Sequence, residues 1–339
     1  MVRQSACRPA GCLETTCLGK ITRGCKAKGL TVNQASRQSR MYLNQDMPRP
    51  LVEHCLDGQV GVFSHRCPGK STSNEDSVAI IEVSEEFLVL AVADGLGGGP
   101  EGEKASRLAV QTLRQEVQAT LTAGVHPRAA ILNGFEAANK AVLQSVRGGA
   151  TTLAVAEIRD GFFRPYHVGD SVLLLMSNRG RVKYESISHS PVGYGIEAGV
   201  LDREEALYRD DRHWVSNVIG SEEMRIEIGP QVAIAPRDTV LVTSDGLIDN
   251  LRVAEIVEEI RKGDLQRGIE SLVEKTRKRM EVKVEGQPSK PDDFTLALYR
   301  PMGLASQAEA DEVAQNPVTL GVANPPEGWA EPSSPTKPL

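Results

Sequence analysis

The chain has 339 residues, of which 40% are apolar and 25% charged, and its formal net charge at pH 7 is −6. That length allows one large domain or two ordinary ones, and the apolar content is enough to build a core. The negative charge excludes a broad basic surface for nucleic acid. No apolar run approaches about 18 residues, which excludes a membrane-spanning helix.

The first 50 residues predict a disordered or processed segment. They mix basic, small and polar residues without periodicity, and Glu14 is the only acid among the first forty. This composition also fits an organellar transit peptide, or an over-long start with Met41 or Met47 as the true beginning. Cys17 and Arg23 match the C-x5-R pattern of cysteine-dependent phosphatases, but no apolar strand precedes them and no helical pattern follows.

The cysteines are confined to the N-terminal part of the chain, so they exclude a disulfide scaffold. The body of the chain has none, which favours a reducing compartment, and we expect a cytoplasmic location. Four of them lie close together near the N-terminus, but their spacing matches no standard zinc pattern. The six are Cys7, Cys12, Cys17, Cys25, Cys55 and Cys67.

A short strand is predicted at 59–65 by its alternating pattern, and the polar segment CPGKSTSNEDS follows at 67–77. The Gly-Lys-Ser in this segment resembles the end of a phosphate-binding P-loop. However, Ser64 stands where the first glycine belongs, and a strand follows instead of a helix. Glu75 and Asp76 lie immediately before that strand, a position that is typical of solvated acids.

The most informative stretch is FLVLAVADGLGGGPEG at 87–102. Its apolar residues predict a buried strand that ends on Asp94, and glycines and a proline follow before a helical pattern starts at Glu103. An acid at the end of a rigid strand, beside bare backbone, suits a cation or a phosphate. The glycines also match G-x-G-x-x-G, but a dinucleotide site needs an acid about 20 positions on after a second strand. The chain around Leu121 is still helical in pattern.

The rest of the chain predicts two helical blocks and many short strands. Amphipathic helices are expected over 103–146, 253–262 and 265–280. Strands at 151–158, 162–168, 171–176 and 181–185 are joined by tight turns and predict one antiparallel meander, and further strands are expected at 77–83, 225–228, 231–234, 238–243 and 294–299. An excursion or flap is expected at 187–223, and His167 is expected to be a packed or a surface histidine and not a ligand.

Acidic residues recur at the ends of these strands or in the loops beside them. Each alone is ordinary turn chemistry, but so many on short strands predict that carboxylates meet in one place. Clustered carboxylates repel unless they are protonated or neutralised by cations. Oxygen ligands without histidine or cysteine select Mg²⁺ or Mn²⁺. The acids are Glu75, Asp76, Asp94, Asp170, Asp245, Asp249, Asp292 and Asp293.

At these residues the chain resembles the protein phosphatase 2C family of metal-dependent serine/threonine phosphatases, in its bacterial form, over about residues 58–300. The motifs, in the family's order and spacing, are NEDS at 74–77, VADGLGG at 92–98, GATT at 149–152, VGDS at 168–171, TSDG at 243–246 and DDFT at 292–295. The resemblance implies an α+β fold, a four-layer α/β/β/α sandwich of two mostly antiparallel sheets with helix pairs outside. We expect the catalytic domain at 51–300, between a disordered 1–50 and a disordered tail at 301–339.

The resemblance also implies the catalytic residues. Asp94 would bridge two metal ions, with the Gly95 carbonyl on the second, while Asp245 and Asp292 would hold the first. A water that bridges two Mg²⁺ or Mn²⁺ ions would then attack the phosphorus in line, without a phosphoenzyme. The other acids have supporting roles.

The resemblance implies two metal ions, and a third if Asp170 and Asp249 also bind one. Glu75 and Asp76 would bind metal-coordinated water. Asp170 and Asp249 match positions that hold a third ion in many bacterial members.

The chain departs from the family pattern in two places. The family usually has a phosphate-gripping arginine four residues before the glutamate of the NED motif, and here that position is Ser71. We predict that Lys70 binds the phosphate in its place, with Arg66 as the alternative, and that Ser71 offers the phosphate one neutral hydrogen bond. Leu96 stands where many eukaryotic members carry a histidine proposed as general acid.

The sequence therefore predicts a phosphoric monoester hydrolase that acts on phosphoserine and phosphothreonine in proteins. Its partners are phosphoprotein substrates, with no nucleic acid and no membrane, and we expect a monomer. The alternative is a catalytically weak or inactive pseudophosphatase that binds phosphoproteins in a regulatory role, supported by Ser71 alone. A nucleotide-binding oxidoreductase is the third hypothesis.

Overall fold

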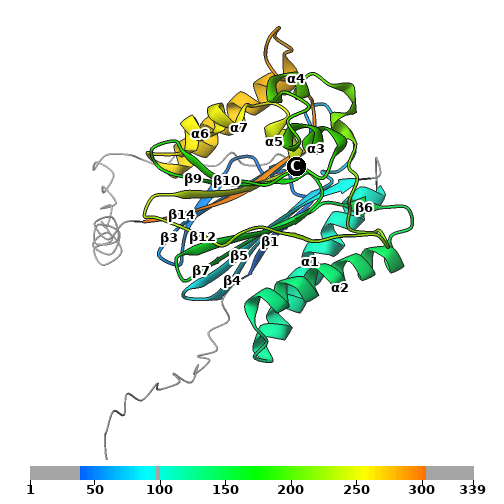
Figure 1. Ribbon diagram of the computed structural model, residues 1–339, viewed down its shortest axis with the longest axis vertical. Coiled ribbons are helices and arrows are strands. Elements are labelled where there is room, and N and C mark those ends of the chain that lie inside the picture. Colours follow the sequence, from blue (N-terminus) through cyan, green and yellow to red (C-terminus); the bar gives the residue numbers. More distant parts are fainter. Residues whose placement is uncertain (1–38, 97–99, 303–339) are drawn as a thin grey trace, which may run out of the picture. The chain divides into compact units, whose positions relative to one another are not determined.

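The computed structural model describes residues 39–96 and 100–302. In this part of the chain two antiparallel β-sheets face each other, and a pair of helices covers the outer face of each sheet (Figure 1). This arrangement confirms the α+β sandwich that the motifs predict.

The first sheet has the order β1-β4-β5-β7-β8-β11, with β6 paired to β5 and β12 paired to β8. Its strands are β1 (Arg40–Leu43), β4 (Asp76–Ser84), β5 (Phe87–Leu96), β6 (Ala150–Thr151), β7 (Leu153–Arg159), β8 (Phe162–Val168), β11 (Glu227–Ile228) and β12 (Val232–Ala233). The second sheet has the order β10-β9-β13-β14-β3-β2. Its strands are β2 (Leu51–Cys55), β3 (Gly58–His65), β9 (Val172–Met176), β10 (Val182–Glu185), β13 (Thr239–Thr243) and β14 (Phe294–Pro301).

The helices form the outer layers and the short connections. The first sheet is covered by α1 (Pro100–Thr122) and α2 (Pro127–Ser145), and the second by α6 (Val253–Ile260) and α7 (Leu265–Glu281), as Figure 1 shows. The short elements are α3 (Pro191–Glu197), α4 (Arg203–Ala206), the 3₁₀ helix η1 (Asp210–His213) and α5 (Asp245–Ile248). None of the described helices is both long and apolar enough to cross a membrane.

Strand β5 is apolar without alternation because both of its faces are covered. Leu88, Leu90 and Val92 belong to the core between the two sheets. Val89 and Ala91 point the other way and pack in the core beneath α1 and α2. Because successive side chains point to opposite faces and both faces are covered, every position must be apolar until the strand leaves the core at its end. The acid Asp94 lies at that end.

The predicted single meander is wrong at Gly169 and Asp170. β7 and β8 form a hairpin in the first sheet, whereas β9 and β10 pair in the second, so the chain crosses between the sheets here. Gly169 has a φ of +107°, and a Cβ on it would lie 2.6 Å from the Thr152 side chain. The crossing therefore requires glycine, and it moves Asp170 from a solvated hairpin to the passage between the two sheets.

The predicted domain start at residue 51 is also wrong. β1 pairs in register with β4, from Arg40 opposite Ile80 to Leu43 opposite Ser77. The N–H of Asn44 then donates to the Asp76 carbonyl at 3.0 Å. A four-residue strand is too short to show periodicity, and its partner is far away in sequence. The disorder predicted for 1–38 and 303–339 lies outside the described residues.

The excursion predicted at 187–223 is more regular than its sequence indicates. It contains α3, α4 and η1 before the chain returns to the edge of the first sheet through β11. Ser190 caps α3, because its hydroxyl accepts a hydrogen bond from the Gly193 N–H at 2.9 Å. Asp202 caps α4 in the same way through the Glu204 N–H at 2.8 Å.

Candidate metal centre

The centre begins with two aspartates on adjacent strands. Asp76 on β4 and Asp94 on β5 are register partners. Asp76 is fully buried, and its Oδ2 accepts a hydrogen bond from the Ser244 hydroxyl at 2.8 Å. Asp94 is fixed through its backbone, since its N–H donates to the Thr152 hydroxyl at 3.0 Å and its carbonyl accepts from the Thr152 N–H at 2.8 Å. The two acids are thus held by groups from both sheets.

Gly95 and Gly102 allow the end of β5 and the start of α1 to pack closely together. A Cβ on Gly95 would lie 2.3 Å from the Gly102 carbonyl oxygen, and one on Gly102 would lie 2.7 Å from Glu75 Oε1. Gly95 also pairs with Thr151 of β6. The third glycine of the G-x-G-x-x-G pattern therefore packs the start of α1 against β5. Gly97 and Gly99 lie outside the described residues.

The single turn of α5 contributes two further acids. Asp245 is its first residue, and the N–H of Asp249 donates to the Asp245 carbonyl at 2.8 Å, which places both on one side of the turn. Between them, a Cβ on Gly246 would lie 2.0 Å from the Asp293 carbonyl oxygen. This close approach brings α5 against the segment that carries Asp292.

The inter-sheet crossing supplies Asp170, and a buried histidine holds that crossing. The Gly169 N–H donates to His189 Nδ1 at 3.1 Å, and the Asn217 side-chain amide donates to the same nitrogen at 2.9 Å. Nδ1 is therefore unprotonated, so Nε2 carries the proton that it shares with Glu227 Oε2 at 3.0 Å. His167 is buried and stacks on this ring at 4.4 Å between centroids, so it packs in the fold as predicted.

The acids lie close enough together for their charges to raise one another's pKa values. Burial, and then the charges of Asp76 and Asp245, raise the pKa of Asp94 well above its ordinary value. Burial and the charge of Asp245 raise the pKa of Asp249 to about 6 and that of Asp292 to about 7. Carboxylates this close cannot all ionise without cations, so the cluster without metal ions retains protons at pH values where an isolated aspartate has lost them.

The donor atoms fit hard divalent cations. Among the described residues, Asp76 Oδ1 and Asp245 Oδ1 are buried without a hydrogen-bond partner. A buried carboxylate oxygen without a partner is costly unless a cation binds it. The surrounding donors are oxygens of carboxylates and backbone carbonyls, the ligands that Mg²⁺ and Mn²⁺ prefer.

Lys290 is a member of the centre that the sequence analysis missed. Its Nζ forms ion pairs with Asp245 Oδ2 at 2.6 Å, Asp249 Oδ2 at 2.8 Å and Asp292 Oδ2 at 3.0 Å. Burial lowers the pKa of Lys290, but the three acids more than offset burial, and its pKa is raised above the ordinary value. The only sequence signal is a lysine two positions before a predicted metal ligand.

Lys70 lies between Glu75 and Asp293. Its Nζ is 2.7 Å from Glu75 Oε2 and 2.6 Å from Asp293 Oδ2. The same Asp293 carboxylate accepts the Glu75 N–H at 2.7 Å and the Cys67 N–H at 2.8 Å. Ser71 is exposed. Lys70 is therefore part of an ion-pair network at the edge of the centre.

Arg66, the other predicted phosphate-binding residue, is also paired. Its Nε lies 3.2 Å from Asp46 Oδ2, and its backbone N–H donates to Asp46 Oδ1 at 2.8 Å. The guanidinium also donates to the Thr72 carbonyl at 3.4 Å. It is more exposed than Lys70, with side-chain exposures of 41% and 21%, so it is freer to change partners.

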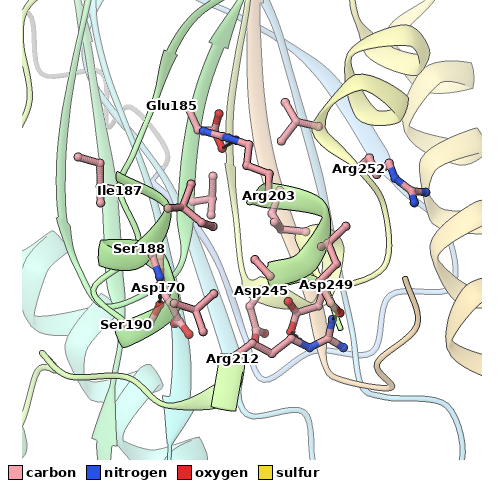
Figure 2. A pocket seen from close by; sticks show the side chains of 18 of the residues that line it. Asp170, Glu185, Ile187, Ser188, Ser190, Arg203, Arg212, Asp245, Asp249 and Arg252 are labelled. Atoms are coloured by element: carbon pink, nitrogen blue, oxygen red, sulfur yellow. Dashed lines mark hydrogen bonds and ion pairs between the residues drawn. The ribbon is translucent and has the colours of Figure 1, made fainter. Parts of the chain in front are cut away.

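A cavity of about 380 Å³ lies between the centre and the 187–223 excursion. Figure 2 shows Asp245, Asp249 and Arg212 together at one end, with Asp170 nearby. Arg212 Nε is 3.9 Å from Asp249 Oδ2, and Arg203 at the other end pairs with Glu185 at 2.7 Å. Much of the remaining lining is apolar, including Val192, Ile196, Leu207, Ile248 and Leu251.

Known proteins resemble this chain in both sequence and fold. A family model described as Protein phosphatase 2C matches residues 64–280. Protein phosphatase PhpP of Streptococcus pneumoniae is 30% identical over 195 residues, which cover 55% of this chain and 78% of PhpP. Serine/threonine phosphatase stp of Listeria innocua is 29% identical over 199 residues, which cover 56% of this chain and 77% of stp.

Solved structures share the fold at lower sequence identity. The S. agalactiae serine/threonine phosphatase superposes with a TM-score of 0.60 at 22% identity, over 72% of this chain and 99% of that one. The catalytic domain of the serine/threonine phosphatase PstP, in complex with two manganese ions, gives a TM-score of 0.55 at 23% identity, over 72% and 98% of the two chains.

The sandwich, its acidic centre and the family match define the class of protein, a metal-dependent protein phosphatase. The matched region 64–280 covers more than half of the sequence. The chain belongs to the protein phosphatase 2C family.

Proposed function

We propose that this chain hydrolyses phosphoserine and phosphothreonine in proteins at a centre of Mg²⁺ or Mn²⁺ ions. The observation that carries the proposal is the convergence of buried carboxylates, two of which, Asp76 and Asp245, have oxygens without a hydrogen-bond partner among the described residues. The names of the PhpP and stp relatives support a serine/threonine phosphatase. The two manganese ions of PstP, which has the same fold, support the choice of metal.

The proposed ligands divide between two ions. Asp94 would lie between them, the Gly95 carbonyl would face one, and Asp245 and Asp292 would hold the other. Divalent ions bound there supply an activated water nucleophile and neutralise charge on the phosphoryl group. The chain's contribution is to hold these oxygens in place before substrate arrives, so that little reorganisation remains at the moment of reaction. The two hydrogen bonds between Thr152 and the Asp94 backbone contribute to this by fixing the main chain that carries the carboxylate.

The cavity beside the centre is the proposed approach for the phosphoprotein. Its acidic end, at Asp170 and Asp249, faces the phosphorylated side chain in this proposal, and the residues of the 187–223 excursion contact the neighbouring substrate residues. The catalytic domain then spans about residues 40–302, and we propose that it acts as a monomer.

The test is a phosphatase assay of the full chain with Mn²⁺ and with EDTA, on p-nitrophenyl phosphate and on phosphoserine, phosphothreonine and phosphotyrosine peptides. We expect turnover only with the metal, and a preference for phosphoserine or phosphothreonine. Asp245→Asn should lower kcat by about 100-fold or more, because the amide loses the charge that holds a cation. Asp160→Asn is the matched control, since Asp160 is exposed in a turn with a φ of +54° that asparagine also adopts.

Full turnover in EDTA, or an unimpaired Asp245→Asn variant, would overturn the assignment of the centre. Binding of Mn²⁺ and of phosphopeptide without turnover would favour the pseudophosphatase alternative.

A further inference from the structure

Lys290 brings a fixed positive charge into the acidic centre. Its Nζ lies within 2.6–3.0 Å of one oxygen on each of Asp245, Asp249 and Asp292. The side chain is 22% exposed, so it is mostly enclosed by the groups that it contacts. The ammonium donates a hydrogen bond to Asp245 Oδ2, and it forms ion pairs with Asp249 Oδ2 and Asp292 Oδ2.

The backbone of Lys290 is held in place by a buried asparagine. The Lys290 N–H donates to Asn250 Oδ1 at 2.9 Å, and the Asn250 amide donates back to the Lys290 carbonyl at 2.7 Å. The same amide donates to the Gly246 carbonyl of α5 at 2.8 Å. Asn250 is fully buried and follows Asp249 in the chain. The loop backbone at Lys290 is therefore anchored through Asn250 to the helix that carries Asp245, so the position of this lysine is fixed by the fold.

A metal ion cannot bind the same three oxygens while the ammonium is there. Divalent cations lie about 2.0–2.6 Å from their oxygen ligands, so an ion at this point would overlap Nζ. Asp245 Oδ1, however, has no partner among the described residues and stays available for an ion on the other side of that carboxylate. The ammonium thus occupies one cation position and leaves the rest of the centre open.

We propose that Lys290 is a built-in cation that takes the place of one metal ion, so that the centre binds two divalent ions and not three. The proposal rests on the proposed function, because it concerns the same carboxylates. It also assigns Lys290 a positioning role: it neutralises Asp249 and Asp292 before any metal binds and stabilises the metal-free fold.

The test is the number of Mn²⁺ ions bound per chain, measured by isothermal titration calorimetry and by metal analysis after desalting. We expect two ions for the unmodified chain and three for Lys290→Met, which keeps the length of the side chain and removes its charge. Lys290→Arg should restore two. Lys283→Met changes an exposed lysine of the same loop and should also give two. Three ions in the unmodified chain, or two in Lys290→Met, would overturn the proposal.

Thermal unfolding in EDTA gives a second readout that does not depend on activity. Lys290→Met should melt about 5 °C or more below the unmodified chain, and Mn²⁺ should restore most of the difference. Lys283→Met should melt with the unmodified chain. An unchanged melting temperature for Lys290→Met in EDTA would contradict the stabilising role.

A further variant keeps the proposal testable if Lys290→Met does not fold. Asp249→Asn removes one partner of the ammonium and leaves the lysine in place. We expect it still to bind two Mn²⁺ ions, whereas a fall by one ion would show that Asp249 holds a metal. A chain that binds no Mn²⁺ at all would instead refute the proposed function, so the two failures are distinguishable.

Discussion

Replacing Lys70 with alanine tests the ion-pair network at the edge of the centre. The Asp293 carboxylate is 4% exposed and depends on Lys70 Nζ at 2.6 Å for its compensating charge. Lys70→Ala leaves that charge buried with only hydrogen bonds from the Glu75 and Cys67 N–H groups. The variant should therefore be less stable than the unmodified chain.

The expected loss is about 2 kcal/mol. Removing one partner of a fully buried ion pair costs about 3–5 kcal/mol, and the cost is smaller here because Lys70 is 21% exposed and water can enter. In a domain of this size, a loss of about 2 kcal/mol lowers the melting temperature by about 4–8 °C. Asp293→Asn should partly rescue Lys70→Ala, because a neutral amide leaves no uncompensated charge, although one N–H loses its acceptor.

The measurement is a double-mutant cycle on Lys70 and Asp293 by thermal and chemical unfolding, with kinetics at a temperature where all variants are folded. A melting temperature of Lys70→Ala within about 1 °C of the unmodified chain would refute the ion-pair reasoning. The kinetics test the predicted phosphate-binding role separately. If Lys70 also binds substrate phosphate, KM should rise by about 10-fold, as expected for one lost charge-assisted hydrogen bond. A rise in Arg66→Ala alone would assign that role to Arg66.

Three further predictions concern stability. In EDTA, the unfolding free energy should fall as the pH rises from about 4 to about 7. The reason is that Asp249 and Asp292, with pKa values raised to about 6 and about 7, still hold protons that the unfolded chain has released. An unfolding free energy that stays constant or rises over this range in urea titrations would contradict the prediction. Deletion through residue 45 should lower the melting temperature by about 5 °C or more because it removes β1, whereas deletion through residue 38 should leave it unchanged. Gly246→Ala should weaken both stability and Mn²⁺ binding, since its Cβ would lie 2.0 Å from a backbone oxygen, while Gly195→Ala, with its nearest contact at 3.4 Å, should not.

Much of the fold could be predicted because its signals are local. The apolar run that ends on Asp94 predicted a buried strand, and the structure has β5 there, covered on both faces. The amphipathic pattern that starts at residue 103 predicted a helix with one buried face, and in α1 that face includes Ala105, Ala109, Leu113 and Val117. The spacing of apolar residues within one helix or strand indicates which of its faces is buried, so no other part of the chain is needed for the prediction.

The residue types of the centre could be predicted from the sequence, but their contacts depend on how the chain folds. Five of the six motifs placed acids at strand ends or in the loops beside them. No local pattern, however, shows that the Lys290 ammonium meets three acids, because that contact depends on Asn250 and on the fold of α5. The pairing of Lys70 with Asp293, 223 positions away, is equally invisible in the sequence. Ion pairs form between elements that the fold brings together, so their geometry is fixed by packing and not by spacing along the chain.

The same reason explains the two errors in the predicted architecture. β1 is four residues long and acquires its structure from β4, from which more than thirty positions of chain separate it. Gly169 and Asp170 have the composition of a hairpin turn, but β9 finds its partners in β10 and β13 of the other sheet. Local patterns in the sequence predicted most of the strands, the two helical blocks and the acidic residues at strand ends. The choice of sheet for each strand, and with it the cation that faces each carboxylate, was decided by long-range pairing that becomes favourable only in the folded chain.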